Sequence, residues 1–227
     1  METKSPMVYV KLKHSLPIDK HLFLMELCRG KKVLDLGSAD YPMTRQKLAR
    51  GELLFARLAG VASELTGVDL EQRGVQAMQE AGFKNVVVGD VESLGDLGLK
   101  GGYDVIVAGE LLEHLSSPGR FMEQVAEVMS SFTVLVLTVP NAFSLKRFLR
   151  VLTGLELVNK NHVCYYSPAT VCELCRRFGL KVNDYFYCLS ESQNWLKRLL
   201  FTPFRLIVKR LFPFVSDDLI FLCKLTS

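Results

Sequence analysis

The groups that could do chemistry in this sequence stand at the ends of short apolar runs. The first run, residues 31–37, ends in Gly37, and a glycine there lets the backbone turn sharply and approach a ligand closely. Asp35 precedes this turn, where its carboxylate can hold the loop or accept a hydrogen bond from an ammonium group. Asp69 ends the next run, and an acid at such a position can accept both hydroxyls of a ribose. Asp90 ends a third run and suits the exocyclic amine of an adenine.

A fourth segment joins small residues to ionisable ones. Ala108 and Gly109 end another apolar run, where small side chains leave room for the body of a ligand. Glu110, Glu113 and His114 follow directly and are candidates for general acid–base catalysis. Glu113 and His114 also stand near the start of an expected helix, where they could serve as local capping partners instead.

A further histidine, His162, lies in an expected extended loop, residues 161–168, and is a candidate catalytic residue at the mouth of the site. A structural histidine with satisfied hydrogen bonds is an equally open interpretation. His162 could also join Cys164, Cys172 and Cys175 in a zinc set. However, Cys172 and Cys175 are spaced as i and i+3 in an amphipathic helical pattern, as buried core thiols are. We therefore expect no metal site.

Short runs rich in Val, Leu and Ile alternate with helical patterns along most of the chain. Such runs are typical of a parallel sheet that helices cover on both faces. The carboxyl ends of parallel strands meet at one edge, which is where doubly wound sheets hold ligands. The expected strands span residues 31–37, 65–70, 85–90, 103–108, 133–139, 181–189 and 219–225. The expected helices span residues 18–28, 48–62, 74–81, 118–129, 144–152 and 169–178.

The composition excludes several classes of protein. The chain has 227 residues, 49% of them hydrophobic and 23% charged, which excludes disorder as its main state. A net charge of +4 is too mild for a nucleic-acid binder. No apolar run reaches the length of a membrane-spanning helix, and the first residues lack the pattern of a signal peptide. We expect a cytoplasmic protein whose six cysteines are free thiols.

Five segments taken together resemble the class I S-adenosylmethionine-dependent methyltransferases. The likeness is to the bacterial-type branch with a D-x-G-x-A-D loop, an E-H-L pair and a V-P-N strand end, which serves small-molecule and glycan acceptors. It covers about residues 30–190 and the last strand. It implies an α/β fold: a doubly wound, seven-stranded, mostly parallel sheet in the order 3-2-1-4-5-7-6, with an antiparallel last strand. The segments are residues 33–40, 68–69, 89–91, 103–118 and 136–141.

The resemblance also implies which residues bind the cofactor, S-adenosylmethionine, which leaves as S-adenosylhomocysteine. It places Asp35, Gly37, Ser38 and Ala39 at the methionine moiety. It places Asp69 at the ribose with Leu70 beside the adenine, and Asp90 and Val91 at the adenine edge. It places Ala108 and Gly109 beneath the sulfonium, with Glu110 facing the acceptor. The sequence departs from the family loop at Ala39 and Tyr41, where glycines are usual. The stretch before Asp69 is also longer than usual, so we expect an insertion around residues 41–55 to lie over the cofactor.

The sequence predicts a lead-in helix within residues 1–30 and one methyltransferase domain over residues 31–227. Within that domain, residues 190–218 form a basic amphipathic insertion before the last strand. Residues 194–212 alternate Lys and Arg with large apolar side chains, a pattern that suits a membrane interface, a helical cap or a dimer contact. The basic helix expected at residues 144–152 could join it in one positive face.

The expected function is methyl transfer from S-adenosylmethionine to a small-molecule or lipid-linked acceptor, at oxygen. Two alternatives stay open at this point: a methyltransferase-like binding module without catalysis, and a nicotinamide-dependent oxidoreductase. The expected partners exclude nucleic acid and include the membrane surface as an open possibility, and the oligomeric state is left open.

Overall fold

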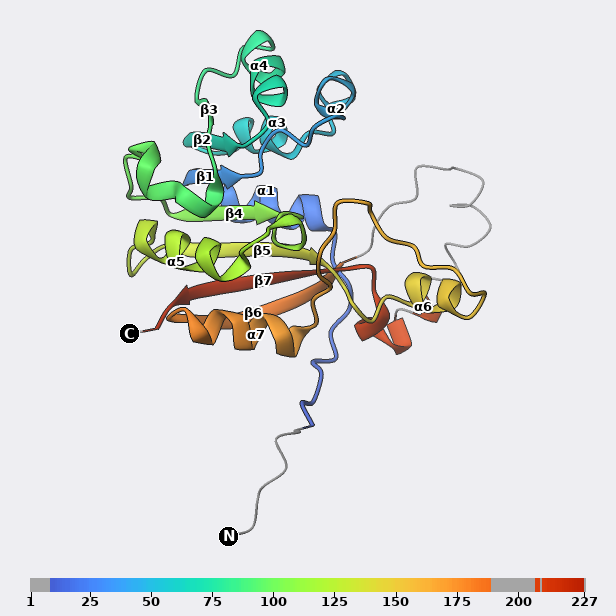
Figure 1. The fold of residues 1–227 in the computed structure, drawn as a ribbon. Helices are drawn as coiled ribbons and strands as arrows, with labels where there is room; N and C mark the ends of the chain where they lie inside the picture. The colour runs from blue at the N-terminus through green and yellow to red at the C-terminus, as the bar shows by residue number, and fades with distance from the viewer. Residues whose placement is uncertain (1–8, 189–206, 209, 227) are drawn as a thin grey trace.

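The computed structural model of the chain describes residues 9–188, 207–208 and 210–226. In this part of the chain seven strands form one sheet in the order β3-β2-β1-β4-β5-β7-β6 (Figure 1). The first five are parallel and β7 is antiparallel to both of its neighbours, which confirms the predicted fold and strand order. The strands are β1 (Lys32–Leu36), β2 (Glu64–Asp69), β3 (Val86–Val88), β4 (Val105–Gly109), β5 (Val134–Pro140), β6 (Leu180–Cys188) and β7 (Asp218–Leu225).

Two hydrophobic cores lie on the two faces of the sheet. Alternate residues of the central strands point to opposite faces, so Leu34 and Ile106 enter one core while Val33 and Val107 enter the other. One core is covered by α5 (Pro118–Val128), α7 (Pro168–Arg177) and the short helix η1 (Val91–Leu97), and the other by α1 (Lys20–Cys28), α3 (Leu54–Ala59) and α4 (Gln72–Glu80). This double cover explains why the central strands are apolar throughout.

The single helix predicted over residues 48–62 is wrong. The chain instead forms α2 (Thr44–Arg50) and then α3, with a break at Gly51. Gly51 has φ 64°, a left-handed conformation that glycine adopts at little cost, and it closes α2. The break lets α3 take its own direction and bury Phe55 and Leu58 against the sheet, while α2 lies beside α4 (Figure 1).

The predicted lead-in helix is present as α1 and begins at Lys20. Asp19 caps it, because its Oδ1 accepts a hydrogen bond from the backbone N–H of Leu22 at 2.8 Å. Leu24 and Cys28 lie in the core that α1 shares with the sheet. The segment before α1 adds a bridge to the far edge of the sheet, between Ile18 and Cys188. The division of the chain at residue 30 stays a prediction.

Most of the predicted basic insertion lies outside the described residues, including Trp195, Lys197, Arg198 and Arg205. Its described end contains the short helix η3 (Pro213–Val215), which leads into β7. The basic helix predicted at residues 144–152 is present as α6 (Leu145–Val151), and none of its side chains is buried. Among the described residues no helix is long and apolar enough to cross a membrane.

Candidate functional site

The carboxyl ends of the parallel strands lie at one edge of the sheet (Figure 1). At the end of β1 the chain turns at Gly37, which has φ 76°. The backbone N–H groups of Gly37 and Ser38 donate to the carbonyl oxygen of Val68 at 2.9 and 3.2 Å. A Cβ added at Gly37 would lie 3.1 Å from the side chain of Leu111, so the turn leaves little room for any larger residue.

Asp69, at the end of β2, holds the turn after β1. Its Oδ2 accepts from the backbone N–H of Ala39 at 2.8 Å, and its Oδ1 accepts from that of Glu71 at 2.9 Å. An ionised carboxylate has about four acceptor positions, so Asp69 keeps two for a ligand. Leu70 beside it is 69% exposed and offers an apolar surface. The two residues therefore combine hydrogen-bond acceptors with a place to pack a flat ring.

Asp35 is almost fully buried beside this turn, at 2% exposure. Burial, together with the negative charge of Asp69, raises the pKa of Asp35 to about 8. A cationic group placed nearby would stabilise the ionised form of Asp35. Asp35 is therefore suited to a ligand that carries an ammonium group.

Ala39 stands where the family loop usually has glycine, and the structure gives a physical reason. Its methyl group is buried against α4, at the position of Gly74. A Cβ added at Gly74 would lie only 2.7 Å from the Cβ of Ala39. The missing side chain on α4 therefore makes room for Ala39. The predicted position of the insertion at residues 41–55, over the cofactor, stays a prediction.

The remaining cofactor candidates differ in exposure. Asp90 is exposed and its Oδ1 accepts from the backbone N–H of Glu92 at 2.8 Å, which caps η1. Val91 and Ala108 are buried in the core, so a ligand could meet them only through the backbone or a small patch of surface. Gly109 is partly exposed at the end of β4.

Glu110 lies in a charge network that includes residues the sequence did not single out. The ammonium of Lys20 contacts Glu110 Oε1 at 2.9 Å and Asp218 Oδ2 at 3.3 Å. Thr138 donates to the same oxygen of Glu110 at 3.0 Å. Burial alone would raise the pKa of Glu110, but the charge of Lys20 and the hydrogen bonds from Lys20 and Thr138 outweigh it and lower the pKa.

Each residue of this network comes from a different part of the chain. Lys20 begins α1, Thr138 lies in β5, and Asp218 begins β7 directly opposite Pro140. Burial and the charge of Glu110 raise the pKa of Asp218 to about 6. In the sequence, the trace of this network is the acidic pair Asp217 and Asp218 before the last apolar run, and that pair does not indicate Lys20 as a partner.

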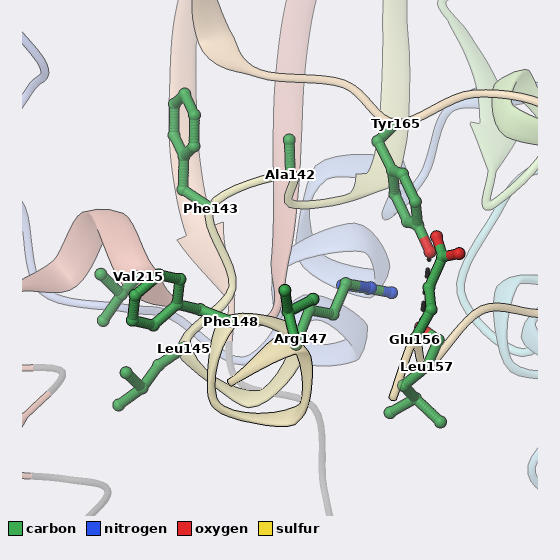
Figure 2. A pocket seen from close by; sticks show the side chains of 10 residues that line it. Ala142, Phe143, Leu145, Arg147, Phe148, Glu156, Leu157, Tyr165 and Val215 are labelled. Carbon is green, nitrogen blue, oxygen red and sulfur yellow. Dashed lines mark hydrogen bonds between the residues drawn. The ribbon is translucent and has the colours of Figure 1, made fainter. Parts of the chain in front are cut away.

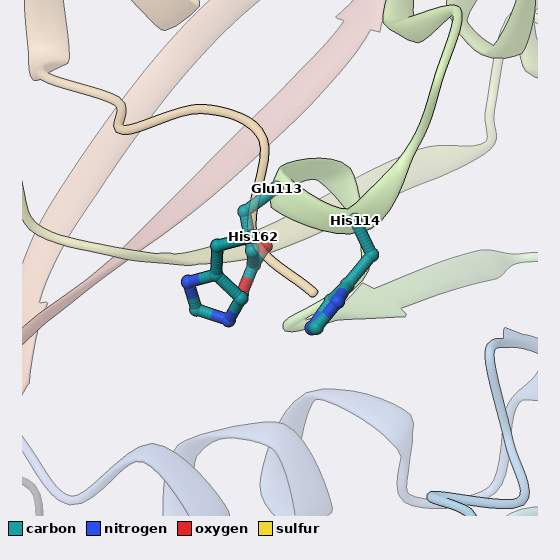
Figure 3. Close-up of side chains that lie close together, drawn as sticks. All are labelled: Glu113, His114 and His162. Atoms are coloured by element: carbon teal, nitrogen blue, oxygen red, sulfur yellow. The ribbon is translucent and has the colours of Figure 1, made fainter. Parts of the chain in front are cut away.

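Three of the predicted catalytic residues form a cluster (Figure 3). Glu113 and His114 belong to the short helix η2 (Leu112–His114), and His162 reaches them from the loop before α7. The rings of His114 and His162 meet edge to face with centroids 4.5 Å apart. His162 Nε2 lies 3.9 Å from Glu113 Oε1. The backbone N–H of Val163 donates to the carbonyl oxygen of Glu113 at 2.9 Å and so ties the loop to η2.

This cluster is unusual in its electrostatics. Glu113 is fully buried, and burial together with the charge of Glu110 raises its pKa to about 8. Burial, followed by the charges of His114 and Arg147, lowers the pKa of His162. The capping role considered for Glu113 is not seen in the structure, because neither of its carboxylate oxygens has a hydrogen-bond partner among the described residues.

An apolar groove of about 420 Å³ lies beyond the end of β5, beside the loop that carries His162 (Figure 2). Its walls come from residues 142–151, from the segment around Leu157 and Tyr165, and from Val215. The guanidinium of Arg147 lies 5.3 Å from the ring centre of Tyr165. The residues that line the groove are Ala142, Phe143, Leu145, Arg147, Phe148, Val151, Glu156, Leu157, Tyr165 and Val215.

Comparison with known proteins identifies the family. A family profile described as a methyltransferase domain matches residues 10–185, which is more than half of the chain. The chain belongs to the class I S-adenosylmethionine-dependent methyltransferases. The cofactor of this family is S-adenosylmethionine. The nicotinamide-dependent alternative therefore loses its support.

Curated relatives of this methyltransferase are bacterial. A ubiquinone biosynthesis O-methyltransferase from Azorhizobium caulinodans is 27% identical over 135 residues, which cover 57% of this chain and 48% of that protein. One of the same name from Thiobacillus denitrificans is 24% identical over 166 residues, covering 68% of this chain and 66% of that protein. The chain thus spans about half to two thirds of the length of these relatives.

Solved structures confirm the fold. A methyltransferase from Archaeoglobus fulgidus superposes with a TM-score of 0.56 at 18% identity, covering 89% of this chain and 90% of that one. The magnesium protoporphyrin IX methyltransferase of Synechocystis, solved with bound S-adenosylhomocysteine, gives a TM-score of 0.55 at 16% identity, with 91% of this chain and 78% of that one covered. At these sequence identities the structural similarity supports the fold alone.

The residues at the strand ends fit the cofactor of the family. The cofactor carries an ammonium group, a ribose diol and an adenine, and the site offers a buried acid, a carboxylate with free acceptor positions and an exposed apolar side chain. These are Asp35, Asp69 and Leu70. The turn at Gly37 also brings backbone close to this space, where a Cβ would press on Leu111.

Proposed function

We propose that this chain transfers a methyl group from S-adenosylmethionine to an oxygen atom of a small or lipid-linked acceptor. The observation that carries the proposal is the convergence of Asp35, the Gly37 turn and Asp69 at the carboxyl ends of β1 and β2. Bound S-adenosylmethionine supplies a methyl group that its sulfonium activates toward nucleophiles. The chain itself then has to align the acceptor and exclude water.

Several side chains would hold the cofactor. Asp69 would accept from the ribose hydroxyls and Leu70 would pack beside the adenine, with Asp90 at the adenine edge. Asp35 and the backbone of residues 37–39 would hold the methionine moiety. Ala108 and Gly109 would leave space beneath the sulfonium because they carry little or no side chain.

The mouth of the site would face the acceptor. Glu110 is engaged by Lys20, so it serves better as a positioning residue than as a base. His162 has a lowered pKa and is therefore a neutral imidazole near pH 7, which allows it to accept a proton or a hydrogen bond. His114 and Glu113 adjoin it. An acceptor hydroxyl at this place would meet these three residues.

The apolar groove supports an acceptor with a large hydrophobic part. Aromatic and aliphatic side chains form most of its wall, and Arg147 supplies a cation. The segment that contains His162 also contributes Leu157 and Tyr165 to the groove. Arg147, which lines the groove, lies close enough to His162 to lower its pKa, so an acceptor in the groove would lie near His162. The names of the curated relatives, which are ubiquinone biosynthesis O-methyltransferases, favour oxygen as the methylated atom.

A membrane surface fits the same end of the molecule. On α6 the large apolar side chains Phe148, Leu149 and Val151 are each at least half exposed, and Lys146 and Arg150 are exposed beside them. Apolar and basic groups on one short helix suit the interface of an anionic bilayer. This contact would bring a lipid-linked acceptor to the groove.

The proposal is tested with methyl-labelled S-adenosylmethionine and a panel of phenolic and lipid-linked hydroxyl acceptors. Transfer of label to oxygen is expected, and extraction of the product separates it from label on the protein. If the chain binds S-adenosylhomocysteine but labels none of the acceptors, the alternative of a binding module without catalysis gains support. Label on nitrogen or carbon would refute the choice of oxygen.

A further inference from the structure

We propose that Glu113, His114 and His162 form a binding site for a divalent transition-metal cation of the zinc type. Each residue offers one donor atom, and these three atoms all lie within 4.8 Å of one another (Figure 3). This revises the expectation of no metal, because nothing in the sequence indicated that residues 113, 114 and 162 would offer their donor atoms to one point. It also differs from the cysteine-containing set considered above, with which it shares only His162.

The distances lie close to those of a closed site. Donor atoms about 2.0–2.1 Å from a zinc ion stand about 3–3.5 Å from one another in a tetrahedral arrangement. The Glu113–His162 donor pair is already 3.9 Å apart, and the widest pair is no more than 4.8 Å apart. Rotation of the imidazole side chains and a small shift of the loop around His162 would close the remaining gap.

The burial of these groups is the second observation. Both carboxylate oxygens of Glu113 are buried without a hydrogen-bond partner among the described residues, and so is Nδ1 of His162. The side chains of Glu113 and His162 are only 1% and 9% exposed. Buried polar atoms without partners are costly, and a buried carboxylate is the costliest of them. A bound cation would satisfy Glu113 directly.

The charges around the cluster favour a cation on balance. Glu110 lies close enough to raise the pKa of Glu113, and Asp218 acts in the same direction. Lys20 and Arg147 oppose them, but Lys20 is already paired with Glu110 and Asp218. The net local charge at the cluster is therefore negative once Glu113 is ionised.

The donor set points to the class of metal. Two imidazoles and one carboxylate are typical of zinc and related first-row cations, whereas magnesium and calcium prefer oxygen ligands throughout. Three protein ligands also leave a coordination position open, as in catalytic zinc sites. The structure thus assigns a site that could hold one further ligand from outside the chain.

A cation there would bind the acceptor oxygen and ease the loss of its proton to solvent. This use of the site rests on the proposed function, whereas binding of the cation does not. Because His162 comes from the loop that also lines the apolar groove, the cation would in addition tie that loop to η2, next to the existing hydrogen bond from Val163 to Glu113.

The test uses the tag-free full chain, stripped with a chelator and titrated with Zn²⁺ by calorimetry and with Co²⁺ by visible absorption. The variants are Glu113→Gln and His162→Ala, and His14→Gln is the matched control because His14 is exposed and lies far from the cluster in sequence. Melting temperature with and without S-adenosylhomocysteine shows whether each variant is folded.

We expect the wild type to bind about one equivalent of Zn²⁺ per chain. The affinity for Zn²⁺ should fall at least ~100-fold in both variants and stay unchanged in the control. The Co²⁺ spectrum should show weak d–d bands of nitrogen and oxygen ligands, without strong thiolate charge transfer. Absence of binding, equal binding by the variants, or a thiolate spectrum would overturn the proposal. If S-adenosylhomocysteine fails to shift the wild-type melting temperature, the proposed function fails while the result on the metal still stands.

Discussion

Replacement of Lys20 by methionine should destabilise the protein in a manner that depends on pH. Lys20 is the cation between Glu110 and Asp218, and its side chain is 18% exposed. Removing one partner of a fully buried ion pair costs about 3–5 kcal/mol. Asp218 is nearly buried at 12%, but Glu110 is 37% exposed and partly screened by water. We therefore expect a loss of ~1–3 kcal/mol in the free energy of unfolding at pH 7.

The pH dependence follows from the two acids that remain. Without Lys20, burial and mutual repulsion would raise the pKa values of Glu110 and Asp218 above their unfolded-state values. An acid whose pKa is raised on folding destabilises the protein above its unfolded pKa, and the penalty disappears as the pH falls through the folded pKa. The pKa of Asp218 is already raised to about 6 in the wild type. The difference between Lys20→Met and wild type should therefore shrink between pH 7 and pH 5.

Urea denaturation at both pH values measures this difference, with Lys84→Met as the control because Lys84 is exposed. The double variant Lys20→Met/Asp218→Asn should recover part of the loss, since it removes one of the two unpaired acids. A loss at pH 7 no larger than that of the control, or one that is equal at pH 5, would refute this interpretation of the network.

Three further predictions address the cofactor turn and the membrane surface. Asp35→Asn should raise the melting temperature of the ligand-free protein more at pH 8 than at pH 6, because the pKa of Asp35 is about 8 and its buried ionised form destabilises the fold. The same variant should bind S-adenosylhomocysteine more weakly, and an equal change in melting temperature at both pH values would contradict this prediction. Gly67→Ala places a Cβ 2.7 Å from Phe55 and 2.8 Å from Ser38, so unfolding free energy should fall by ~1–3 kcal/mol; no loss in urea denaturation would contradict the tight packing. Reversing Lys146 and Arg150 to Glu should reduce co-sedimentation with anionic vesicles at least ~10-fold, since each basic residue near such a surface contributes about 1 kcal/mol; unchanged pelleting would exclude α6 from the contact.

The strand order and the main cofactor positions could be predicted from the sequence because the signal repeats. Each apolar run ends in a small or acidic residue, and parallel strands bring such ends to one edge. The single helix predicted over residues 48–62, between β1 and β2, is wrong because the pattern stays helical through Gly51. The pattern alone does not show that α3 takes a new direction to bury Phe55.

Long-range contacts could not be predicted in the same way. Lys20 and Asp218 come together through the end of β6, because Cys188 pairs with Asp218 in β7 and forms a bridge with Ile18, two residues before Lys20. Glu113 and His162 meet because a loop without regular structure folds back onto η2. Neither contact leaves a periodic trace along the chain, so the charge network and the candidate metal site become visible only in the structure.

The central claim is that residues at the carboxyl ends of neighbouring strands bind one molecule of the cofactor. Calorimetric titration of S-adenosylhomocysteine into wild type, Asp69→Asn and the exposed control Asp96→Asn tests it most directly. We predict about one site per chain in wild type and control, and at least ~10-fold weaker binding in Asp69→Asn, which corresponds to about 1.4 kcal/mol of lost hydrogen bonding. Binding that is absent in the wild type, or equally tight in Asp69→Asn, would contradict the central claim.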